Sequence, residues 1–169
     1  MSQNNMEMWL NRALEMENRG RDFYERVAAS NLEAAVRDFF KFLADQEGVH
    51  QRIIRDLYSQ QSHNAAPAEP QAAGGPSLNK IFLTLNKSRP AADTDLIQAI
   101  EHAQTLETET AAFYRDAQAW TDDVAAKEFL RTLSGEENDH YQALADLKLF
   151  YTNPEAWAEK MAAIHLDGA

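Results

Sequence analysis

The sequence predicts an all-α protein, an antiparallel four-helix bundle with one long crossover and a short C-terminal helix. Three observations predict this fold class. Apolar residues recur at spacings of three and four along four long segments, which is the period of an amphipathic helix. The chain repeats its own pattern at a constant offset of 90 residues. A segment rich in proline and glycine separates the two copies, as a crossover would.

The composition bounds both the size of the core and the kinds of function. With 169 residues, 44% of them hydrophobic, the chain can form a single domain over residues 1–169. No apolar run approaches the roughly 20 residues that cross a bilayer, and the N-terminus lacks the features of a signal peptide. We therefore expect a cytoplasmic protein without a membrane partner. The net charge of -11 also argues against nucleic acid as a partner.

The absence of cysteine narrows the possible metal chemistry. Without cysteine there can be no disulfide, thiolate zinc site, iron–sulfur cluster or rubredoxin-type iron centre. Any metal bound by this chain must use oxygen and imidazole ligands.

The first predicted hairpin covers about residues 6–60. Its first helix runs from about Met6 to Ala29, and its inner face consists of Leu10, Ala13, Leu14, Glu17, Tyr24 and Val27. Ser30 and Glu33 have the spacing of a capping box, which predicts the start of a second helix there. That helix runs to about Gln60, and its inner face consists of Phe40, Leu43, Glu47, His50, Ile54 and Leu57.

The predicted crossover occupies about residues 61–92. Prolines and adjacent glycines in residues 62–76 break both helix and strand, so we expect a mobile connector. Residues 77–87 then form a short amphipathic helix, whose apolar side consists of Leu78, Ile81, Phe82 and Leu85. We expect this helix to lie against the bundle.

The second predicted hairpin covers about residues 93–151. Its first helix runs from near Asp93 to about Trp120, with Leu96, Ile100, Ala103, Glu107 and Tyr114 inward. Thr121, Asp122 and Asp123 predict an N-cap and an acidic first turn for the next helix, whose inner face consists of Leu130, Leu133, Glu137, His140, Leu144 and Leu147. Asn153 and Pro154 then mark the start of a C-terminal helix over residues 154–166.

The 90-residue repeat brings the polar inner-face residues into matched positions. Glu17 matches Glu107, and the pair Glu47 and His50 matches Glu137 and His140. At 1.5 Å per residue, the two glutamates of the first hairpin lie roughly 20 and 24 Å from its turn. The second hairpin has the same spacing, so four carboxylates and two imidazoles should meet at one depth of the bundle.

These six residues form a candidate site for two metal ions. A glutamate and a histidine three residues apart lie on one face of a helix and can reach the same ion. Four buried carboxylates would repel one another, and each would carry a desolvation cost of several kcal/mol, unless cations neutralised them. By symmetry Glu47 and Glu137 should bridge the ions, while Glu17 and Glu107 are terminal ligands. The alternative is a metal-free network of protonated glutamates bonded to the histidines.

Oxygen and imidazole ligands favour two iron ions, with manganese or zinc as possible substitutes. Through these residues the chain resembles the rubrerythrin branch of the ferritin-like diiron superfamily. The resemblance covers about residues 7–151 and rests on Glu17 with Tyr24, Glu47-x-x-His50, Glu107 with Tyr114, and Glu137-x-x-His140. It implies a non-haem diiron centre that reacts with dioxygen or hydrogen peroxide, usually in a homodimer.

The chain departs from this family in two respects. Without cysteine it has no rubredoxin domain, so the electron donor must be a separate protein. One turn beyond the third-helix ligand, where rubrerythrins with that domain have another glutamate, this chain has Thr110. Glu109 is adjacent but points about 100° away.

Two functions therefore stay open. The first is an oxidoreductase that reduces hydrogen peroxide or dioxygen with external electrons. The second is a ferroxidase or iron-binding protein without an organic substrate.

Several other residues have weaker candidate roles. The hydroxyls of Tyr24 and Tyr114 could bond to the ligands or quench an oxidant, or both residues could be ordinary core tyrosines. Gly20 and Thr110 could leave a channel for oxygen or only permit close helix packing. Arg21 is expected to extend to solvent. Three histidines match no ligand position and are expected at the surface, namely His63, His102 and His165.

Overall fold

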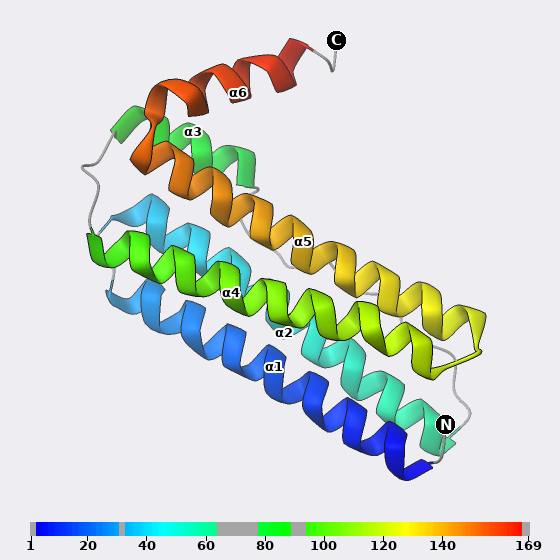
Figure 1. Ribbon diagram of the computed structural model, residues 1–169. Helices are drawn as coiled ribbons and strands as arrows, with labels where there is room; N and C mark the ends of the chain where they lie inside the picture. Colours follow the sequence, from blue (N-terminus) through cyan, green and yellow to red (C-terminus); the bar gives the residue numbers. More distant parts are fainter. Residues whose placement is uncertain (1–2, 31–32, 64–77, 89–93, 167–169) are drawn as a thin grey trace.

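Four long helices lie side by side in an elongated bundle (Figure 1). The computed structural model describes residues 3–30, 33–63, 78–88 and 94–166. The long helices are α1 (Gln3–Ser30), α2 (Ala34–His63), α4 (Thr94–Ala117) and α5 (Val124–Thr152). Helix α1 packs on α2, α4 packs on α5, and α1 also contacts α4. The described residues contain no strand, and the predicted all-α, ferritin-like bundle is confirmed.

The junction between α1 and α2 differs from the prediction. Ser30 does not cap the second helix, because it is the last residue of α1 and its hydroxyl donates to the carbonyl of Val27 at 3.0 Å. Helix α2 begins at Ala34, where the backbone carbonyl of Glu33 accepts from the amide of Arg37 at 3.0 Å. A serine hydroxyl can bond to its own helix as readily as to the next, and sequence spacing cannot distinguish the two.

The crossover contains the predicted short helix, α3 (Leu78–Ser88). Its apolar side is buried through Ile81, Phe82 and Leu85, and it packs against α2. Helix α2 continues to His63, so Ser62 and His63 belong to a helix and not to the predicted connector. The rest of the predicted connector, residues 64–76, lies outside the described residues, as does the chain between α3 and α4.

The second hairpin begins and ends close to the predicted residues. Helix α4 passes into a short 3-10 helix, η1 (Gln118–Trp120). Asp123 then caps α5, since its carboxylate oxygen Oδ1 accepts from the amides of Ala125 at 2.8 Å and Ala126 at 3.1 Å. Helix α6 (Pro154–Leu166) starts at the predicted proline, and the Asn153 side chain accepts from the amide of Ala156 at 3.1 Å.

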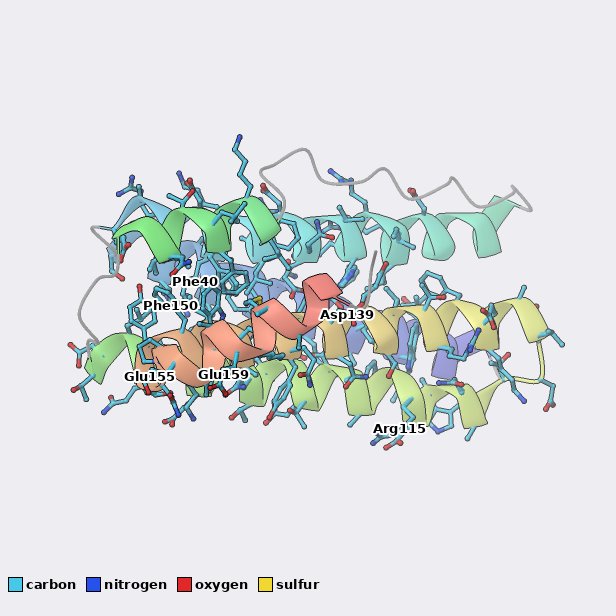
Figure 2. All side chains as sticks on the ribbon, turned by 90° about the horizontal axis from the view of Figure 1, so that it is seen from above. Phe40, Arg115, Asp139, Phe150, Glu155 and Glu159 are labelled. Atoms are coloured by element: carbon cyan, nitrogen blue, oxygen red, sulfur yellow. The ribbon has the colours of Figure 1, made fainter. Side chains whose placement is uncertain are left out.

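The apolar core consists of two clusters, one toward each end of the bundle. The larger includes Phe39, Phe40 and Leu43 and extends to α3 and α6, where Trp157 packs on Phe150 with ring centroids 5.1 Å apart. Figure 2 shows Phe40 and Phe150 at this end, whereas Arg115 extends outward at the other. Burial of each large apolar side chain contributes about 1.5–3 kcal/mol, which offsets the cost of burying polar residues between the clusters.

The smaller cluster fills the opposite end and includes Trp9, Leu10, Ile54 and Leu133. Along each long helix, the buried polar residues stand between the members of the two clusters. The predicted inner-face residues of the long helices are buried, except for Leu14, which is partly buried, and Leu57, whose side chain is outside the described part. The two clusters therefore enclose a polar layer between them.

Candidate metal centre

The six predicted ligands come together in this polar layer. Helix α1 supplies Glu17, α4 supplies Glu107, and α2 and α5 each supply a glutamate and a histidine one turn apart. None of the six is more than 6% exposed. The spacing of three residues on α2 and α5 places each glutamate–histidine pair on the inner face, as expected for a helix.

The site divides into two groups of four that could each hold an ion. One group is Glu17, Glu47, His50 and Glu137, and the other is Glu47, Glu107, Glu137 and His140. Within each group, one ligand atom per residue lies within 4.8 Å of all the others. Glu47 and Glu137 belong to both groups, which is the arrangement that the prediction of two bridging glutamates requires.

Both histidines turn the same ring nitrogen toward the carboxylates. The Nδ1 of His50 lies 3.0 Å from Glu137 Oε1 and 3.2 Å from Glu17 Oε2. The Nδ1 of His140 lies 3.3 Å from Glu137 Oε2 and 3.6 Å from Glu107 Oε1. The two imidazole rings are stacked, with centroids 5.6 Å apart and planes 20° apart. Each ring therefore directs one nitrogen into the centre of the site.

Some of the polar atoms at the centre make no hydrogen bond. Both carboxylate oxygens of Glu137 and the Nδ1 of His140 are buried without a hydrogen-bond partner. A buried polar atom without a partner costs free energy, and a bound cation would satisfy all three. The donor set of carboxylates and imidazoles also suits divalent first-row metals. The residues present therefore fit a pair of metal ions.

Burial and mutual repulsion divide the four glutamates into two classes when no metal is bound. Burial raises the pKa of both Glu17 and Glu107 well above the usual value. The next largest cause is the charge of Glu47 for Glu17 and the charge of Glu137 for Glu107. Burial also opposes ionisation of Glu137, but the positive charges of His50 and His140 outweigh it and lower its pKa. Glu47 shows the same balance, and its interactions with Glu17 and both histidines lower its pKa.

The histidines are held in the protonated form by these carboxylates. Burial alone would lower the pKa of His50, but Glu137, Glu136 and Glu17 raise it well above the usual value. Burial likewise opposes protonation of His140, and Glu107, Glu137 and Glu47 outweigh it. The shifts therefore favour protons on Glu17, Glu107 and both histidines, and negative charge on Glu47 and Glu137. Without metal, the protein neutralises this cluster with protons.

The two tyrosines contact the site in a crossed arrangement. The Tyr24 hydroxyl, on α1, donates to Glu107 Oε1 on α4, and the Tyr114 hydroxyl, on α4, donates to Glu17 Oε1 on α1. Both tyrosines are fully buried. Burial and these carboxylates raise the pKa of both phenols, so both remain donors. Each predicted terminal ligand is therefore held by the tyrosine of the opposite hairpin.

One residue that touches the site, Glu136, was not predicted from the sequence. The Oε2 of Glu136 lies 3.1 Å from the Nε2 of His50, on the side of the ring away from the other carboxylates. Glu136 directly precedes Glu137 on α5, so it points about 100° away from Glu137 on the helix. From the sequence it is therefore expected at the surface. The signal in the sequence was a mismatch in the repeat, because the matching position is Gln46.

The remaining candidates have clear positions. A Cβ at Gly20 would lie 3.4 Å from the carboxylate carbon of Glu47, and the Thr110 hydroxyl donates to the carbonyl of Leu106 at 3.0 Å. Arg21 and Glu109 both form exposed ion pairs. Arg21 pairs with Glu25 at 2.9 Å, and Glu109 pairs with Arg19 at 2.5 Å.

The histidines outside the site can be placed only in part. His102 is exposed and packs edge-on against Phe23, with ring centroids 4.8 Å apart. His63 ends α2 and His165 lies in α6, but the side chains of both are outside the described part of the chain.

The fold and the site together define a ferritin-like helical bundle with a buried carboxylate–histidine cluster. The rubrerythrin family model matches residues 8–148, which include α2 and α4, most of α1 and α5, and the six clustered residues. The chain therefore belongs to the rubrerythrin family. No curated protein and no solved structure matches the chain. In the part of the chain that is described, no helix is both long and apolar enough to cross a membrane.

Proposed function

We propose that this protein is a non-haem diiron carboxylate oxidoreductase that reduces hydrogen peroxide or dioxygen. The observation that carries the proposal is the pair of overlapping four-residue groups that share Glu47 and Glu137. Glu17 and His50 would complete the sphere of one ion, and Glu107 and His140 that of the other. Iron is the metal that we propose, because oxygen and imidazole ligands suit it and the chain belongs to the rubrerythrin family.

The chain supplies position, charge and exclusion of water, while the bound ions would supply the electrons for the reduction. Glu47 and Glu137 form the negative centre that two divalent ions would share. Tyr24 and Tyr114 donate hydrogen bonds that orient the two terminal carboxylates. The apolar clusters on both sides keep the site in a low-dielectric environment, in which these charge interactions are strong.

The electrons come, in this proposal, from a separate donor protein. The sequence contains no cysteine, and a rubredoxin-type iron centre cannot form without it. We also propose that the protein acts in the cytoplasm. Its family resemblance implies a homodimer, and sedimentation of the metal-loaded protein would test this oligomeric state. Neither a nucleic acid nor a membrane is part of the proposal.

The test is anaerobic loading with ferrous iron followed by hydrogen peroxide or dioxygen. We expect an absorption band from iron–oxygen charge transfer and steady turnover with an artificial electron donor. The matched control is Glu109→Gln, which removes an exposed carboxylate of α4 two residues from Glu107 and should turn over like the wild type. A protein that holds two irons per chain yet turns over neither oxidant would contradict the proposed activity.

One observation favours the second candidate, a ferroxidase or iron-binding protein. At the position one turn beyond Glu107, Thr110 bonds to its own helix and offers no carboxylate to the site. The centre thus lacks the additional glutamate that is expected of rubrerythrins with a rubredoxin domain. Iron stoichiometry after aerobic loading distinguishes the two functions, since retention of far more than two irons per chain would favour iron handling.

A further inference from the structure

The two histidines of the site differ in what lies behind them. His50 engages carboxylates through both ring nitrogens, with Nδ1 toward the centre and Nε2 at 3.1 Å from Glu136 Oε2. His140 contacts carboxylates only through Nδ1, and among the described residues no carboxylate oxygen lies within 4.0 Å of its Nε2. The six predicted ligands are therefore related by the repeat, but the groups that contact the two histidines from behind are not.

The repeat explains where this asymmetry comes from. Glu136 occupies the position that corresponds to Gln46 in the first hairpin, at the same 90-residue offset that relates the ligands. Gln46 is half-buried and neutral, whereas the Glu136 side chain is 47% exposed and ionisable. Two otherwise matched halves therefore differ by one charge beside one histidine.

A carboxylate behind a metal-binding imidazole has a defined effect. When one ring nitrogen binds a metal, the other carries a hydrogen, and a hydrogen bond from it to a carboxylate fixes the ring orientation and strengthens the imidazole as a ligand. The geometry at His50 meets this requirement, because the two nitrogens lie on opposite sides of the ring. Solvent reaches Glu136 and weakens the interaction, so a moderate effect on affinity is expected.

We propose that Glu136 is a positioning residue for His50 and makes the metal position of Glu17, Glu47, His50 and Glu137 the tighter of the two. The inference rests on the metal centre of the proposed function, but not on which oxidant it reduces. It predicts that the two ions bind in two steps of unequal affinity. The first ion should occupy the half of the site that contains Glu17 and His50.

The test is titration of the metal-free protein with cobalt(II), monitored by absorption and calorimetry. The wild type should bind two ions in distinct steps. Glu136→Ala should weaken the tighter step by roughly 10- to 100-fold and leave the other step unchanged. Glu136→Gln keeps an acceptor oxygen without the charge and should lie between them. The mirror variant Gln46→Glu should strengthen the weaker step and bring the two closer together.

A second readout separates positioning from a general loss of structure. In the cobalt-loaded protein each bound imidazole has one exchangeable N–H proton with a strongly shifted resonance. Glu136→Ala should move or broaden one of these resonances and leave the other in place. The melting temperature of the metal-free protein should fall only slightly, because solvent weakens the contact of Glu136 with protonated His50. Two equal binding steps that Glu136→Ala leaves unaltered would overturn the inference alone. A wild type that binds no cobalt would overturn the metal centre as well.

Discussion

At the scale of single residues, Glu47, like Glu137, contacts both halves of the site. Its carboxylate belongs to both four-residue groups and is 3% exposed. It lies 3.7 Å from the Nδ1 of His50 and 3.6 Å from the Nδ1 of His140. One side chain therefore serves both halves, and its loss should affect both proposed ions together.

We expect Glu47→Ala to lose most of its bound metal. The wild type should contain about two metal ions per chain, and the variant should fall well below one, because each proposed ion loses a shared ligand. Metal analysis of the purified proteins checks this result. Glu109→Ala on α4 is the control, since that exposed carboxylate lies outside the site. Equal metal content in the wild type and Glu47→Ala would refute the assignment of Glu47.

Gly20 is the residue where side-chain size should matter most. A single Cβ there would lie at an ordinary contact distance of 3.4 Å from the carboxylate carbon of Glu47, and a longer side chain would overlap the carboxylate. Gly20→Ala should therefore retain metal and gain up to about 1 kcal/mol in stability from helix propensity. Gly20→Leu should lose metal, because it displaces Glu47. Metal content and urea unfolding measure the two effects, and full metal content in Gly20→Leu would contradict this account.

At the scale of secondary-structure elements, α5 is the helix whose boundaries the structure defines best. Asp123 caps its first turn through two backbone amides, and the amide of Asn153 closes its last turn on the carbonyl of Leu149 at 2.8 Å. The helix also contains an exposed glycine, Gly135, where an added Cβ would meet no atom within 4 Å. Its stability should thus respond in opposite directions to changes at two exposed positions.

We expect Asp123→Ala to destabilise the protein by about 1 kcal/mol, since two amides at the start of α5 lose their acceptor. Gly135→Ala should stabilise it by roughly 0.5–1 kcal/mol, because alanine loses less backbone freedom in a helix. Urea unfolding of the metal-free proteins measures both changes. Neither substitution should alter metal content, and a change of the same sign in both variants would contradict the assigned roles.

At the scale of the whole molecule, the four long helices share an interior cluster that protons or the proposed metal ions could neutralise. Without metal, the directions of the pKa shifts favour the neutral form of Glu17 and Glu107 and the positive form of both histidines. Metal ligation requires ionised carboxylates and neutral imidazoles. The cluster is close to neutral in both states, with protons as the positive charge in one and metal in the other.

Loading divalent ions should therefore release protons from Glu17, Glu107 and the two histidines, because ligation favours ionised carboxylates and neutral imidazoles. The metal-free protein holds more protons than the loaded one, so affinity should rise with pH and the metal should dissociate as pH falls. Calorimetry in buffers of different ionisation enthalpy gives the proton count. A pH-independent affinity would show that the cluster is already deprotonated before metal binds.

Much of the fold could be predicted because most local sequence signals, such as helix caps and apolar faces, had only one structural interpretation. The capping aspartate of α5, the proline that begins α6 and the apolar side of α3 all lie where the sequence indicated. The start of α2 was placed too early, because Ser30 had two possible partners and the nearer one, Val27, accepted its hydroxyl. Spacing can identify a residue able to cap a helix, but it cannot show whether its hydroxyl will accept from an amide of the next helix or donate to a carbonyl of its own.

The sequence by itself determined the four-helix bundle and the six residues that come together, because a 90-residue repeat of helical periodicity defines matched inner faces. Only the tertiary structure decided which other residues form hydrogen bonds with these six. Tyr24 bonds to Glu107, and not to Glu17 on its own helix, while Glu136 reaches across from α5 to His50. These contacts depend on how the helices rotate and shift against one another, and the period of a single helix contains no information about either.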